Sequence, residues 1–316
     1  MALAEVFANV RIWVALGIAC GLIFGSLGPE TPTMVIAVLM VQMVLSMDGV
    51  SFKRADLKGR GRDVAAAVLV CYAAGGGMCV LCGLLFLGDA PIWKGWALMA
   101  AMPCAVSSIT ISLFARGNLR LSILSMTAVY LLSLATAPLV TLALIGDAVS
   151  PLQIFKYVVL FIAVPLALNV PIGRANIDRR VKVSIINVMI FLLIMLSLGH
   201  NRGYVLSEPG AVLAMFALNI ARIFGATLLM VRVFKKRGTD RSRGIIYVSM
   251  AVWRNSGLAM SLCMVLLADA SEAVIPAMTA IVAEMIWFAV IIDYLNKRWP
   301  ADGGPLPGSA PDPNGS

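Results

Sequence analysis

The chain alternates between long apolar segments and short polar connections. A helix that crosses a membrane needs about 20 largely apolar residues. Ten segments meet this requirement, and we predict a membrane-spanning helix in each: 9–28, 32–50, 64–87, 94–115, 119–146, 151–172, 181–199, 209–232, 244–268 and 272–296. The pattern therefore predicts an all-α integral membrane protein with ten transmembrane helices.

Charged residues divide the connections into two sets. Every second connection is basic, and the largest basic clusters lie at 53–62, 174–182 and 232–243. The alternate connections carry acids such as Asp89 and Glu208. Because short basic loops remain in the cytoplasm, the pattern predicts cytoplasmic termini, in a bacterial inner membrane.

Two predicted helices are interrupted at matching places in the two halves of the chain. Pro103 breaks the fourth segment, because proline removes a backbone donor. Polar residues 254–257 break the ninth. Backbone groups freed within a membrane must line an enclosed cavity, and paired interruptions of this kind indicate a secondary transporter.

The number of spans also predicts internal symmetry. Residues 1–148 would hold five spans and residues 149–298 another five. Because five is odd, the second set enters from the opposite side, as an inverted repeat requires. The tail at 299–316 is rich in proline and glycine, and we predict that it is disordered.

Composition narrows the function classes. Of the 316 residues, 60% are hydrophobic and 13% charged, as in an integral membrane protein. The net charge of +9 comes from short loop clusters, which does not favour nucleic-acid binding. The six cysteines lie in apolar segments, and no metal cluster, cofactor motif or catalytic constellation is visible. We therefore expect neither a metal site, a cofactor nor an enzyme.

Several motifs resemble a known family. The residues concerned are Pro103, Ser108, Ala115-Arg-Gly-Asn118, Leu121-Ser122, Met126-Thr127, Ala137-Pro138 and Asn255-Ser-Gly-Leu-Ala259. They are similar to helices 4, 5 and 9 of the bile acid:sodium symporter family. The resemblance implies a panel domain (helices 1, 2, 6 and 7), a core domain (helices 3–5 and 8–10), and interrupted helices 4 and 9 that cross. It also implies sodium-coupled uptake of organic anions.

The chain departs from that family where sodium-coupled relatives bind the cation. Ile109 replaces an asparagine, Met250 an acidic residue and Arg254 a glutamine. Sodium is a hard cation that prefers oxygen ligands, and a guanidinium repels it. We therefore predict transport without sodium at the usual site. The alternative is sodium symport through a rearranged site made of Ser108, Ser122, Thr127 and exposed carbonyls.

The two breaks supply the candidate substrate ligands. A charge at mid-membrane normally faces a cavity or a partner, so Arg254 either binds a carboxylate or sulfonate or forms a structural ion pair. The helix start after Pro103 directs a positive dipole end into the crossing. The predicted substrate-binding residues are Arg254, Asn255, Ser107, Ser108 and Thr110, and the helix-break residues are Pro103, Cys104, Ser256 and Gly257.

Two further charges lie inside predicted spans. Glu284 would neutralise Arg254 or Arg222, or carry a proton. Arg222 needs a partner or must extend toward the cytoplasmic surface. We assign both to the region that couples transport to an ion, with the choice between proton and sodium left open.

The sequence thus predicts a secondary active transporter that moves a small organic anion across the lipid bilayer by alternating access. Two alternatives come from other classes. Cys104 lies in the fourth helix, where arsenite efflux permeases use a cysteine, and a thiolate suits trivalent arsenic. A membrane sensor or enzyme without transport activity is the other. Substrate identity, transport direction and oligomeric state do not follow from the sequence.

Overall fold

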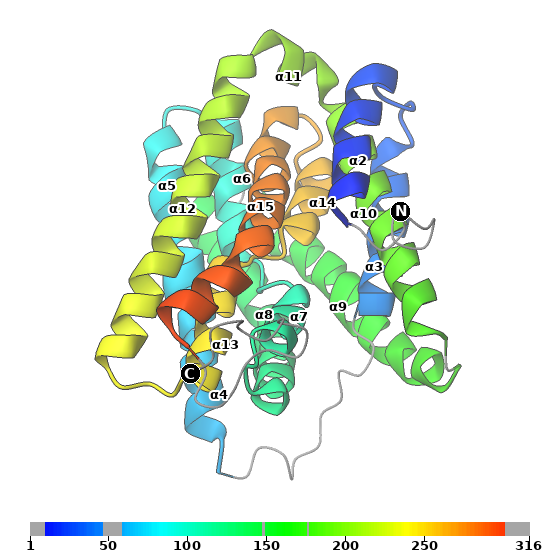
Figure 1. Cartoon of the computed structure of the whole chain (residues 1–316). Helices are drawn as coiled ribbons and strands as arrows, with labels where there is room; N and C mark the ends of the chain where they lie inside the picture. Colours follow the sequence, from blue (N-terminus) through cyan, green and yellow to red (C-terminus); the bar gives the residue numbers. More distant parts are fainter. Residues whose placement is uncertain (1–9, 47–58, 147–148, 176, 301–316) are drawn as a thin grey trace, which may run out of the picture.

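The computed structural model describes residues 10–46, 59–146, 149–175 and 177–300, and within these ranges the chain is helical and contains no strand (Figure 1). Its helices are α2 (Val10–Phe24), α3 (Thr31–Ser46), α4 (Gly61–Leu69), the π-helix η2 (Val70–Gly76), α5 (Gly77–Gly83), the 3-10 helix η3 (Leu84–Phe86), α6 (Ala90–Ala101), α7 (Ser107–Phe114), α8 (Leu119–Ile145), α9 (Pro151–Arg174), α10 (Arg179–His200), α11 (Arg202–Ser207), α12 (Pro209–Lys236), α13 (Arg241–Val252), α14 (Ser256–Leu266), the 3-10 helix η5 (Ser271–Val274) and α15 (Ile275–Arg298).

Helical structure occupies each of the ten predicted segments. Six helical segments are long and apolar enough to cross a membrane, and they lie at 61–86, 119–145, 151–168, 180–200, 209–236 and 272–298. Shorter apolar helices, α2 and α3, occupy the first two segments. The fourth and ninth segments are each divided into two helices, α6 with α7 and α13 with α14, as the sequence predicted. The molecule is an integral membrane protein.

Local sequence explains where the helices begin. Asp89 accepts a hydrogen bond from the amide of Ile92 at the start of α6, and Asn118 does the same for Leu121 at the start of α8. Such side-chain caps satisfy backbone donors that have no partner inside the helix. In the connection between α7 and α8, just before this cap, Arg116 adopts a positive φ of 56°.

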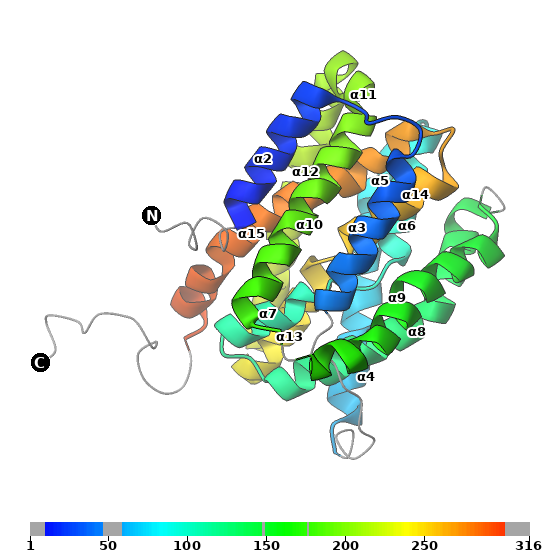
Figure 2. The same ribbon diagram turned by 90° about the vertical axis from the view of Figure 1, so that its right-hand side faces the viewer.

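Four helices form a layer on one side of the molecule. α10 packs against both α2 and α3, and α3 packs against α9 (Figure 2). Glycine permits the close approach of α2 to α10, since a Cβ at Gly17 would lie 2.9 Å from the carbonyl oxygen of Phe191. The other long helices, together with the two broken segments, pack beside this layer, and α14 contacts α3 across the boundary.

The connections lie at two opposite ends of the molecule. The start of α4 and the turns α9–α10 and α12–α13 lie at the lower end in Figure 1, whereas α11 and the turns α2–α3 and α14–α15 lie at the upper end. The lower set is the one that the sequence showed to be basic. Trp299, at the start of the predicted tail, is buried over Gly244. Residues 301–316 of that tail lie outside the described residues.

Candidate functional site at the helix crossing

The two broken segments meet at their breaks. Cys104 and Arg254 form an antiparallel backbone bridge. The amide of Asn255 donates to the carbonyl of Pro103 (2.9 Å), and the amide of Ala105 donates to the carbonyl of Trp253 (3.2 Å). Each break therefore satisfies backbone groups of the other, which explains why both can exist in an apolar interior.

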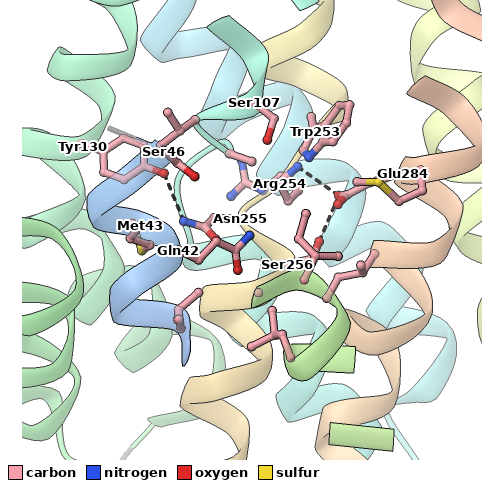
Figure 3. A pocket seen from close by; sticks show the side chains of 18 residues that line it. Gln42, Met43, Ser46, Ser107, Tyr130, Trp253, Arg254, Asn255, Ser256 and Glu284 are labelled. Carbon is pink, nitrogen blue, oxygen red and sulfur yellow. Dashed lines mark hydrogen bonds between the residues drawn. The ribbon is translucent and has the colours of Figure 1, made fainter. Parts of the chain in front are cut away.

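A pocket opens beside this crossing. It has a volume of about 630 Å³, including the space at its mouth. Figure 3 shows its polar residues around the two breaks. The residues that line it are Leu39, Gln42, Met43, Ser46, Ala105, Val106, Ser107, Tyr130, Ile190, Leu193, Trp253, Arg254, Asn255, Ser256, Gly257, Ile281, Glu284 and Met285. The pocket thus joins α3 and α10 of the four-helix layer to both breaks and to α15.

The Arg254 side chain is fully buried and binds backbone carbonyls. Nη1 donates to Cys71 O (2.7 Å) and approaches the Cys71 sulfur (3.5 Å). Nη2 donates to Ala100 O (2.7 Å) and to Met102 O, and Nε lies 3.4 Å from Met99 O. A guanidinium has five N–H donors, and these contacts engage all of them. The cation therefore neutralises the negative carbonyl end of α6.

The Cys71 carbonyl reaches Arg254 because the third helical segment packs closely against the two broken segments. Cys71 lies in the π-helix η2, and such bulges displace a carbonyl from the regular helical pattern. A Cβ at Gly75 would lie 2.7 Å from Ala251 O, and one at Gly76 would lie 2.9 Å from Ala100 O. The two glycines thus let η2 approach both broken segments.

Glu284 of α15 also binds at the crossing. Its Oε1 accepts hydrogen bonds from the Ser256 hydroxyl (2.9 Å) and from the backbone amide of Arg254 (3.2 Å; Figure 3). Arg222 Nη2 lies 3.9 Å from the same oxygen. Of the two arginines predicted to pair with Glu284, Arg222 forms the ion pair with its carboxylate. Arg254 contributes only its backbone amide.

Asn255 fixes the start of α14. Its Oδ1 accepts from the amide of Leu258 (3.1 Å), and its Nδ2 donates to the hydroxyl of Tyr130 on α8 (3.1 Å). The first residues of α14, Ser256 and Gly257, line the pocket, and so does Ser107, the first residue of α7. Two helix N-termini therefore direct their partial positive charge at one pocket.

The remaining predicted hydroxyls lie in other places. Ser108 is buried outside the pocket lining, and its Oγ has no hydrogen-bond partner among the described residues. Ser122 accepts a hydrogen bond from Ser112 (3.0 Å), whereas the Thr127 hydroxyl bonds its own helix at Ile123 O (2.9 Å). Thr110 lines a neighbouring pocket.

That second pocket continues the first toward the basic end. It shares Ser46, Val106 and Ser107 with the pocket at the crossing, and it is also lined by Thr110 and Lys182. Ser107 lines both. The predicted residues Ser107 and Thr110 thus follow one path from the crossing to the start of α10.

Cys104, the candidate arsenic ligand, is fully buried. Its sulfur contacts the Met126 sulfur (3.7 Å), and it does not line either pocket. Across the described ranges, no three His, Cys, Asp or Glu side chains are placed to hold a metal ion. The thiol is therefore separated from the pocket at the crossing.

Sequence reasoning missed Gln42 and Tyr130. Gln42 is the one polar side chain in the apolar stretch 34–45, and a polar residue within a span is a usable signal of function. Its Oε1 is buried without a hydrogen-bond partner in the described structure. Tyr130 gave no such signal, because an aromatic residue in an apolar helix is equally suited to packing.

Comparison with known protein families identifies the family of this chain. The model of the family described as "Sodium Bile acid symporter family" matches residues 33–208, which is more than half of the chain. No curated protein matches. The matched range includes α3, the first break and α10, all of which line the pocket. The chain is a membrane transporter of the bile acid and arsenite permease type, and it belongs to the sodium bile acid symporter family.

Proposed function

We propose that this protein is a secondary active transporter that carries a small organic anion by alternating access. In this proposal the ten segments span the membrane as two inverted repeats of five, and the basic end faces the cytoplasm. The four-helix layer α2, α3, α9 and α10 acts as the panel against which the remaining helices move. The pocket lies between these two groups, where such a movement would expose it alternately.

One observation carries the choice of an anion: the N-termini of α7 and α14 line the same pocket. The partial positive charge of the helix dipole at these ends favours negative charge. The Ser107 hydroxyl is exposed there and available as a donor, and Asn255 lies beside it. We propose Ser107, Asn255 and Ser256 as the polar contacts of the substrate, with Gln42 facing them from α3.

We assign Arg254 a structural role and not direct binding of the substrate. Its guanidinium donors are engaged by carbonyls of α6 and η2. We propose that it acts as a permanent cation that holds the crossing together, and that transport is for this reason independent of sodium at this place. Binding of a mobile cation beside a fixed guanidinium would be opposed by repulsion.

Thermal stability of the purified chain in detergent tests both parts. A ligand that binds only the folded state raises stability by RT ln(1 + [L]/Kd). We expect at least one of three probes, taurocholate, pyruvate or ethanesulfonate, to raise the unfolding temperature at constant ionic strength. Replacing choline chloride by sodium chloride should leave both the unfolding temperature and the effect of the probe unchanged.

The matched variant is Ser107→Ala, which removes one donor from the pocket while the helix and its start remain. It should weaken the binding of the probe about tenfold, which corresponds to one lost hydrogen bond of about 1.4 kcal/mol. A rise in stability that requires sodium would contradict the sodium-independent mechanism. The absence of any change in unfolding temperature with all three anions would contradict the anion specificity.

A further inference from the structure

Glu284 is the carboxyl group that lines the pocket, and its described contacts all involve one of its two oxygens. Ser256 and the Arg254 amide donate to Oε1, and Arg222 approaches that oxygen. Within the described ranges, Oε2 receives no hydrogen bond, although the residue borders the pocket. Oε1 is therefore hydrogen-bonded within the protein, whereas Oε2 can contact a molecule bound in the pocket.

Arg222 is the charge that balances an ionised Glu284, and it has further contacts of its own. When Glu284 is ionised, Arg222 on α12 balances it at 3.9 Å, which is too long for a hydrogen bond. Arg222 also has other partners, since Nε donates to Asn219 Oδ1 (3.2 Å) and Nη1 lies 3.4 Å from Val252 O. Arg222 would therefore remain held after Glu284 takes up a proton.

Among the residues that the structure describes, Glu284 is the one carboxyl group at this surface. Apart from Glu284, the charged or titratable side chains that line the pocket, among the described residues, are Arg254 and the Tyr130 phenol. The Arg254 guanidinium is engaged by carbonyls. The faces of α3, α7 and α10 contribute Gln42, Ser46, Ser107 and apolar side chains. From α12, Arg222 is the charge that faces Glu284.

We propose that Glu284 is a proton-binding site and that its proton is bound together with the anion. The inference rests on the proposed function, since it assigns the coupling ion of the same pocket. An ionised Glu284 would repel an anion held at the starts of α7 and α14. A protonated Glu284 instead donates a hydrogen bond from Oε2 to that anion, while Oε1 keeps its bonds to Ser256 and to the Arg254 amide.

The proton balance of the cycle follows directly. A proton from the aqueous phase binds Oε2, the anion binds beside it, and both leave on the opposite side. No covalent bond other than O–H forms or breaks. Transport of a monovalent anion is then electroneutral, and a pH gradient drives it in the direction in which protons flow.

The test compares the full chain with two variants. Glu284→Gln keeps the size and the donor of the protonated acid but removes its titration. Glu208→Gln makes the same change at an exposed position between α11 and α12. Binding of taurocholate, pyruvate and ethanesulfonate is measured by calorimetry over a range of pH. Two buffers with different ionisation enthalpies report the number of protons taken up.

At pH values above that at which Glu284 ionises, we expect the wild type and Glu208→Gln to take up one proton with each anion bound. Their affinity should fall about tenfold for each pH unit above the pH at which Glu284 ionises, because only the protonated fraction binds. Glu284→Gln should bind the anion at all pH values with no proton taken up. Binding by the wild type that is independent of pH and takes up no proton would overturn the proposal.

Infrared spectroscopy of the same samples separates this proposal from the proposed function. A protonated carboxyl group has a C=O stretch distinct from that of a carboxylate. A band that titrates in the wild type and in Glu208→Gln, and is missing in Glu284→Gln, supports the proton site even if none of the three probes binds. Its absence from the wild type at all pH values overturns the site. If Glu284→Gln does not fold, Glu284→Asp must shift the same band, and an unshifted band overturns the assignment.

Discussion

Replacing Arg254 by lysine tests whether its guanidinium is a structural cation. Lys keeps the positive charge but has three donors in place of five. At least one of the four carbonyls at Cys71, Met99, Ala100 and Met102 then loses its donor in a fully buried place. An unsatisfied buried group costs about 1 to 3 kcal/mol, so Arg254→Lys should lose at least about 1 to 3 kcal/mol of stability.

The assay is thermal unfolding of the purified protein in detergent. At about 2 °C per kcal/mol, which is the lower end of the range for large domains, the unfolding temperature should fall by at least about 2 to 6 °C. The matched control is Arg62→Lys, an exposed position near the start of α4, where a change within about 0.5 kcal/mol is expected. If Arg254→Lys unfolds with the wild type but binds the anion probes much more weakly, the guanidinium contacts substrate and our reasoning is wrong.

Two further predictions concern packing and pH. Gly75→Ala should lower the unfolding temperature by an amount corresponding to about 1 to 3 kcal/mol, because the new Cβ would lie 2.7 Å from the carbonyl oxygen of Ala251. The control is Gly77→Ala, which should be nearly neutral because the space around its Cβ is open. A hydrogen bond from the Ser242 hydroxyl, aided by the amide of Arg243, lowers the pKa of Asp240 below its ordinary value of 3.8. The ionised Asp240 side chain therefore stabilises the protein above pH 3.8, and this contribution is lost as the pH falls through the lowered pKa. In thermal scans, acidification should reduce the stability of the wild type relative to Asp240→Asn.

The helices could be predicted because their signals are local. Long apolar segments and basic connections are read directly from the chain, and both breaks fell where Pro103 and the polar stretch 254–257 interrupt apolar runs. The end of α2 was less accurate, because the helix stops at Phe24 whereas the segment predicted for it runs to residue 28. Apolar composition alone does not mark where helical hydrogen bonding ends.

The candidate site was predictable only in part. Prolines and charges inside apolar segments identified the crossing, Arg254 and Glu284 as unusual, because such residues are costly in a membrane. Arg222 was one of the two partners predicted for Glu284, and it lies 3.9 Å from that carboxylate, whereas the partners of the Arg254 guanidinium were not accessible in this way. Arg254 binds carbonyls of α6 and η2, and carbonyls are present at every residue, so no sequence pattern distinguishes the ones that are used.

What the sequence determined by itself is the class of the molecule, its helices, its two breaks and the alternation of its connections, all of which depend on local composition and on the cost of polar groups in lipid. The tertiary structure decided the rest. It joined two breaks about 150 residues apart through the Cys104–Arg254 bridge, turned the Arg254 guanidinium toward carbonyls, and left Glu284 facing the pocket. These outcomes depend on which helices meet at the crossing, and that is set by the packing of the whole chain.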